Sequence, residues 1–138
     1  MTPEELLRTI YLGDRGCKAV MIDSWNKRVE IQVTVISRLK PGATNWDFDN
    51  DADITEGWLV FSDVRRISFE PSGPLPNDFI NDISVKTIES PEGQPTYLFE
   101  LSIGSVDHEG NSTEVIVKIE ASSLHLKDPK RPGVEVRS

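Results

Sequence analysis

Apolar and polar residues alternate along most of this chain, and a period of two residues is typical of strands with one buried face. The longest alternating stretch, residues 28–39, carries four β-branched residues on one face: Val29, Ile31, Val33 and Val35. The residues between them are polar, so we expect one half-buried strand. Residues 40–43 end it, because proline cannot donate to a strand ladder and glycine loosens the backbone.

Residues 57–69 show a different pattern, with apolar side chains on both faces. Trp58 and Val60 lie on one face of the first half, and Leu59 and Phe61 lie on the other. A strand with two apolar faces is buried on both sides. We therefore predict that this stretch forms a central hairpin, with its turn at Ser62 and Asp63.

The amino terminus has the features of a helix start. Thr2 precedes Pro3, and Glu5 stands three positions after Thr2, as in a capping box. An apolar stripe at helical spacing follows: Leu6, Leu7, Ile10 and Tyr11. This pattern predicts a short amphipathic helix at about residues 3–12.

Further alternation predicts strands at residues 17–23, 79–88, 97–103, 115–119 and 124–126. The connections between them suit hairpins and are too short for helical crossovers. The fold class that we predict is mainly β (α+β): an antiparallel β-sandwich or partly open barrel of about eight strands with one N-terminal amphipathic helix. We assign residues 1–126 to a single globular domain. Residues 127–138 form a basic, poorly ordered or edge-lying C-terminal tail with four basic and two acidic residues.

Composition narrows the choice of partner. The chain has 138 residues and a formal net charge of -8, which argues against nucleic acid, since phosphate binding depends on clustered Lys and Arg. A basic protein is the natural complement. No apolar run approaches the roughly 20 residues that span a bilayer, and Met1 leads into polar residues without a secretory pattern. With a single cysteine, a cytoplasmic location is our expectation.

An acidic, aromatic loop at residues 45–56 is the sharpest local feature. Its side-chain oxygens follow the spacing of a calcium-binding loop, at positions 1, 3, 5, 7, 9 and 12: Asn45, Asp47, Asp49, Asp51, Asp53 and Glu56. The match is partial, because Asn50 stands where glycine makes the sharp turn and the flanks resemble strand ends. Ca²⁺ is accordingly one hypothesis for this loop, and we expect no other cofactor.

The same loop can instead bind a protein partner. Trp46 and Phe48 stand among the carboxylates of Asp47, Asp49, Asp51 and Asp53, and interfaces concentrate binding energy in aromatic residues ringed by complementary charge. A third alternative is a solvated acidic loop with no ligand. The sequence leaves all three open.

No catalytic motif stands out, and we predict no catalytic residues. Cys17 with His108 or His125 would make a thiol and its base, but a buried inert thiol is the favoured interpretation. We expect His108 to be exposed in a turn and His125 to face outward, because it alternates with Leu124 and Leu126. Asp14 and Arg15 are expected to form a buried ion pair that closes the turn, with a small functional pair as the less favoured alternative.

The order of several segments adds a resemblance. These are residues 12–20, the strand 29–36, the stretch 57–69 with its Phe61-x-x-Val64 pair, the Ile80-x-x-Ile83 segment, and residues 114–126. In these segments the chain resembles a set of small bacterial proteins of unknown function, and it is loosely similar to immunity proteins of polymorphic toxin systems.

The resemblance implies a non-enzymatic protein that binds and neutralises a cationic toxin domain, and it carries over no catalytic residues. The alternative hypothesis is a β-barrel that binds a divalent cation or small ligand through the Asp-rich loop 45–56.

Overall fold

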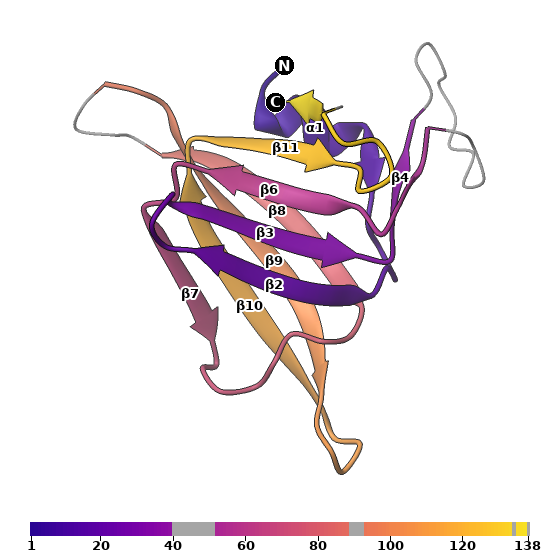
Figure 1. The fold of residues 1–138 in the computed structure, drawn as a ribbon. Helices are drawn as coiled ribbons and strands as arrows, with labels where there is room; N and C mark the ends of the chain where they lie inside the picture. The colour runs from indigo at the N-terminus through magenta and orange to yellow at the C-terminus, as the bar shows by residue number, and fades with distance from the viewer. Residues whose placement is uncertain (40–51, 89–92, 134, 138) are drawn as a thin grey trace.

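The computed structural model describes residues 1–39, 52–88, 93–133 and 135–137. Its strands form three antiparallel sheets, shown in Figure 1. The five-stranded sheet has the order β12 (Glu135–Arg137), β11 (Ser123–Lys127), β6 (Trp58–Ser62), β3 (Arg28–Val33) and β2 (Cys17–Asp23). The four-stranded sheet has the order β7 (Arg66–Glu70), β10 (Ser112–Ala121), β9 (Thr96–Val106) and β8 (Ile80–Ile88). A small third sheet comprises β1 (Ile10–Tyr11), β4 (Val35–Arg38) and β5 (Ile54–Thr55).

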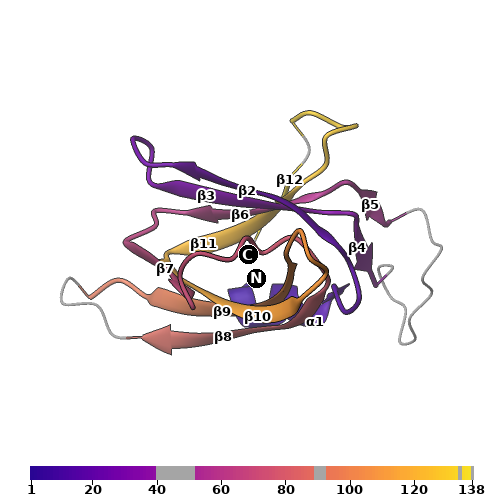
Figure 2. The same ribbon diagram turned by 90° about the horizontal axis from the view of Figure 1, so that it is seen from below.

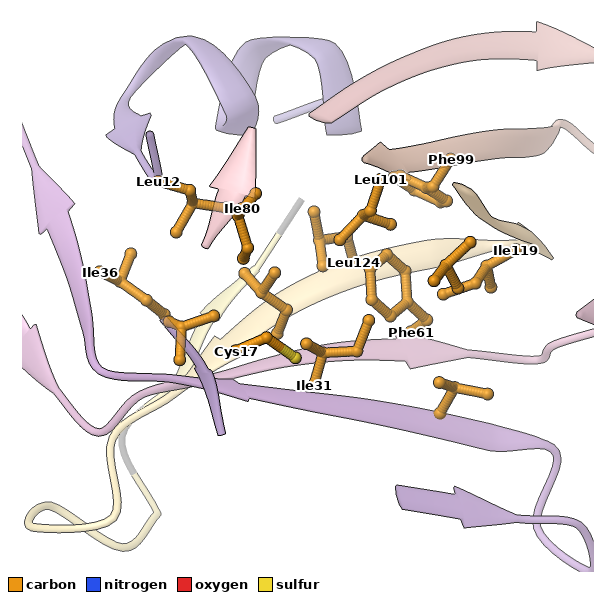
Figure 3. Close-up of a cluster of buried hydrophobic side chains, with 14 of the residues drawn as sticks. Leu12, Cys17, Ile31, Ile36, Phe61, Ile80, Phe99, Leu101, Ile119 and Leu124 are labelled. Carbon is orange, nitrogen blue, oxygen red and sulfur yellow. The ribbon is translucent and has the colours of Figure 1, made fainter. Parts of the chain in front are cut away.

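The two large sheets face each other as the layers of a sandwich, as Figure 2 shows. Their inner faces meet in one hydrophobic core, where Phe61 of β6 packs edge-on against Phe99 of β9 with ring centroids 5.0 Å apart (Figure 3). The sandwich is thus the confirmed alternative, since the described strands do not close into a barrel. The described residues contain twelve strands, more than the eight expected, because several are only two to four residues long.

The helix is confirmed but shorter than predicted. α1 spans Pro3–Arg8, and the Thr2–Glu5 capping box is formed. The helix ends at Thr9, whose N–H donates to the carbonyl of Leu6. Ile10 then joins β1, which pairs with β4. The prediction that the helix reaches residue 12 is wrong. Ile10 fits the helical spacing of the apolar stripe, but it is buried as a residue of strand β1.

The single strand predicted at residues 28–39 is wrong, because it divides at Thr34 into β3 and β4, which belong to different sheets. Thr34 changes partners at this point: its N–H donates to the carbonyl of Gly16 at 2.9 Å, and its own carbonyl accepts from the N–H of Glu56 at 2.8 Å. Apolar alternation continues through the division, so the pattern did not reveal the corner.

The central hairpin predicted at residues 57–69 is also wrong. β6 does lie at the centre of the five-stranded sheet, but β7 pairs with β10 in the other layer. Leu59 and Phe61 face the core, while Val60 is buried on the outer face of its sheet. The chain changes layers after Asp63, which has a positive φ of 52°. β6 and β7 are consecutive in the sequence, but they therefore lie in opposite layers instead of pairing.

The strand predictions for the second half of the chain are confirmed by β8, β9, β10 and β11. Of the residues that the pattern placed inside β9 and β10, Tyr97 is only partly buried against the core, and the others are fully buried: Phe99, Leu101, Ile103, Val115, Val117 and Ile119. Lys127, the first residue of the predicted tail, is the last residue of β11, and β12 pairs with that strand at the sheet edge. The domain division at residue 126 stays a prediction.

Candidate functional site

Most of the acidic loop falls outside the described residues, including Asn45, Trp46, Asp47, Phe48, Asp49 and Asp51. Asp53 accepts a hydrogen bond at Oδ1 from the N–H of Arg38 at 3.1 Å. Glu56 pairs with Lys18 at 2.7 Å, and this partner lowers the pKa of the Glu56 carboxyl. Among the residues that the structure describes, no group of three His, Cys, Asp or Glu side chains could hold a metal. Calcium binding and partner binding by this loop stay predictions.

Cys17 and the two histidines do not come together. Cys17 belongs to the core, and burial raises the pKa of its thiol to about 11, so it is an inert thiol at neutral pH. His108 is exposed in a turn, as predicted. His125 alternates with two core leucines and so lies on the outer face of the same sheet as Cys17.

Arg15 is directed away from Asp14, and the predicted ion pair is wrong. The guanidinium of Arg15 donates to Ser37 Oγ at 2.6 Å and lies 5.9 Å from the centroid of the Tyr11 ring. Asp14 is exposed and has a positive φ of 59°. Arg15 therefore anchors this turn to Ser37, 22 residues further along the sequence, instead of pairing with its neighbour Asp14.

His125 faces outward as predicted, but it is buried there, because only 8% of it is accessible. Its Nε2 lies 3.5 Å from Glu135 Oε1 of β12, and desolvation lowers the pKa of its imidazole. Beside it, the buried Glu30 pairs with Lys127, whose Nζ lies 5.4 Å from the centroid of the Trp58 ring. The His125–Glu135 contact joins β11 to β12, and the Glu30–Lys127 pair joins β3 to β11 across β6, so we assign these groups a structural role.

The charge of the chain is concentrated in one region. Residues 67–117 contain nine Asp or Glu residues and a single basic residue, Lys86, which gives this stretch a formal charge of -8, as large as that of the whole chain. The stretch builds most of the four-stranded sheet. This run of 51 residues with one lysine is visible in the sequence, but the surface it makes depends on the fold.

The loop between β7 and β8 creates that surface. β7 and β8 are the two edge strands of their sheet, so the loop must cross the full width of β9 and β10. Figure 1 shows the β9–β10 hairpin extending past the five-stranded sheet, with this loop running across it. We call the loop, residues 71–79, together with the hairpin tip, residues 104–114, the hairpin end.

Asn77 fastens the loop to the hairpin. Its side-chain amide donates to the carbonyl of Val106 at 3.1 Å, and its Oδ1 accepts from the N–H of Val106 at 2.9 Å. The main-chain N–H groups of Asn77 and Asp78 both donate to the carbonyl of Gly104. A Cβ at Gly104 would lie 3.1 Å from the Cβ of Asp78, so glycine permits this close approach.

The hairpin tip is held by Asp107. Its Oδ1 accepts from the N–H groups of Glu109 and Asn111, each at 2.9 Å. These bonds, chiefly the one from Asn111, lower the pKa of the Asp107 carboxyl. The tip therefore keeps its negative charge at neutral pH and below.

A groove of about 390 Å³ lies between the loop and the hairpin. Leu75 is 73% exposed and Val106 is 37% exposed in its lining. A second hollow, of about 290 Å³, is lined by Asp78, Glu114 and the half-exposed Phe79. Within the described part of the chain, neither lining includes Lys or Arg. The hairpin end thus combines exposed apolar side chains with unneutralised carboxylates.

Comparison with known proteins places the chain by family. A model described as a family of unknown function, DUF6258, matches residues 1–138. The chain belongs to the DUF6258 family. No curated protein and no solved structure matches it. Family membership thus confirms the predicted likeness to proteins of unknown function.

The described part of the chain contains no helix that is long and apolar enough to span a membrane.

Proposed function

We propose that this DUF6258 protein is a non-enzymatic protein-binding module that takes a basic partner at the hairpin end. The observation that carries the proposal is the exposure of Leu75, Phe79 and Val106 among carboxylates in a region with one lysine. Apolar side chains in a polar surround are typical of protein-binding surfaces. Carboxylates beside them steer a basic partner into place and reject an acidic one.

Rigidity supports the same proposal. The loop is fastened through Asn77 and Gly104, and the tip through Asp107. A surface held in its binding conformation loses little conformational freedom when a partner binds, and this favours affinity. The leading candidate for the partner is a cationic toxin domain, because of the resemblance to immunity proteins of polymorphic toxin systems. The acidic loop 45–56 is the second surface that such a partner would contact.

The test uses two synthetic peptides, one alternating Lys and Leu and the other alternating Glu and Leu. We expect the lysine peptide to shift the backbone NMR signals of residues 75–79 and 104–114, and the shifts to weaken as salt screens the charges. The glutamate peptide should leave them unchanged. Equal shifts with both peptides, or shifts confined to other surfaces, would contradict the proposal.

A pair of variants tests the apolar contribution. If Leu75 and Phe79 are central anchors, replacement of both by Ser should weaken binding of the lysine peptide by about 2 kcal/mol, which is roughly 30-fold in Kd. Trp25→Ser is the matched control, since Trp25 is 93% exposed at a different turn. If the Kd of the double variant stays within twofold of the value for the unmodified protein, the hairpin end is not the anchor.

A further inference from the structure

The edges of the two large sheets are protected to different degrees. An exposed edge presents unpaired main-chain groups to any extended chain, and proteins blunt such edges with charge, irregularity or short length. β12 has three residues, two of them charged. β7 has a charged residue at each end and is followed by Pro71. β8 carries Asp82, Lys86 and a register shift between Ile80 and Asp82. Three of the four edges are thus blunted.

β2 is the exception. It is the edge of the five-stranded sheet, its charged residues Lys18 and Asp23 lie only near its ends, and its four central residues 19–22 are all uncharged and apolar. A register shift occurs near its start, between Cys17 and Ala19, so the regular part begins at Ala19. Met21 and Ile22 are 43% and 49% exposed, and Trp25 in the following turn is 93% exposed. The edge therefore offers both main-chain groups and apolar side chains.

An open pocket of about 170 Å³ adjoins the end of β2. Its lining includes Ile22, Val29, Val64 and Ile67, and its size is comparable to the ~150 Å³ apolar cavity that holds a benzene-sized group. Four basic residues share the lining: Lys27, Arg28, Arg65 and Arg66. Asp23 is the acidic residue that we find among the described lining: its carboxylate accepts two hydrogen bonds from Asn26 and lies 3.5 Å from the guanidinium of Arg28, with which it forms an ion pair. The pocket is apolar with a basic rim.

We propose that β2 and this pocket bind an extended acidic segment of a partner protein. The segment adds to β2 as a further strand through main-chain hydrogen bonds. One of its apolar side chains enters the pocket beside Ile22, and its carboxylates lie against Lys27 and Arg66. The basic rim selects for an acidic segment, because it attracts acidic side chains and repels basic ones. The inference concerns a different surface from the hairpin end, with the opposite charge.

The experiment uses a capped eight-residue peptide of alternating Glu and Val, titrated into the full chain by calorimetry and by backbone NMR. We expect shifts at residues 19–25 and 64–67, and no binding of the corresponding Lys and Val peptide. Lys27→Glu combined with Arg66→Glu should weaken binding of the Glu and Val peptide at least tenfold. Lys86→Glu, a single charge reversal of the same kind on the edge strand β8, is the control and should have no effect.

Two N-methylated forms of the peptide test strand addition without altering the protein. N-methylation at alternate residues blocks the donors along one edge of an extended peptide. The form whose blocked edge faces β2 should bind at least tenfold more weakly, and the form blocked on the other edge should bind normally. Equal binding of both forms would overturn the proposal. Formation of a dimer of this chain that excludes the peptide from β2 would also overturn it.

Discussion

Asn77 should determine how firmly the β7–β8 loop is held to the hairpin. Asn77→Ala removes the two hydrogen bonds to Val106, at 2.9 and 3.1 Å. Each such bond contributes about 0.5–1.5 kcal/mol net. Val106 is 37% exposed, so water can replace the lost partners, and the lower half of the range applies. Two such bonds give an expected loss of about 1–2 kcal/mol, on the order of a tenfold rise in local opening.

Hydrogen exchange by NMR measures this opening residue by residue, because local opening and global unfolding are resolved at individual amides. The amide of Val106 should exchange about tenfold faster in Asn77→Ala, while the core amides of β10 change little. Asn77→Asp should have an intermediate effect on that amide, because it keeps an acceptor for the Val106 N–H and loses the donor. Asn81→Ala, at an exposed asparagine of β8, is the control. Unchanged exchange at Val106 in Asn77→Ala would refute the reasoning.

Two further predictions concern the core and the sheet edge. Phe61→Ala removes a fully buried ring that packs on Phe99 and should cost about 3–5 kcal/mol in urea unfolding; a loss below about 1 kcal/mol would contradict the assigned packing. Burial lowers the pKa of His125, so the unfolded chain binds more protons near pH 6 and stability should fall as the pH drops from 7 through the ordinary histidine range. His125→Gln should flatten that dependence, and an equally steep profile in the variant would count against it.

The strands of the second half of the chain were predictable because each obeys a local rule. Alternate side chains of β9 and β10 enter the core, and an antiparallel hairpin needs no information from distant segments. The capping box of α1 was predictable for the same reason, since all of its contacts lie within four residues. Exchanges of pairing partner were not predictable. Thr34 and Asp63 each separate two strands that belong to different sheets, and apolar alternation continues on both sides.

The same distinction applies to the surfaces. The sequence by itself determined that the chain is acidic, mainly β and rich in hairpins, because composition and alternation are properties of consecutive residues. It also showed the run with a single lysine. That this run lines a groove with both exposed apolar and polar side chains follows from the tertiary fold. The order β7-β10-β9-β8 forces one loop across the whole sheet, and bonds from Asn77 to Val106, 29 residues away, hold it there. Burial of His125 depended likewise on β12, because no local pattern shows which distant strand will cover a side chain.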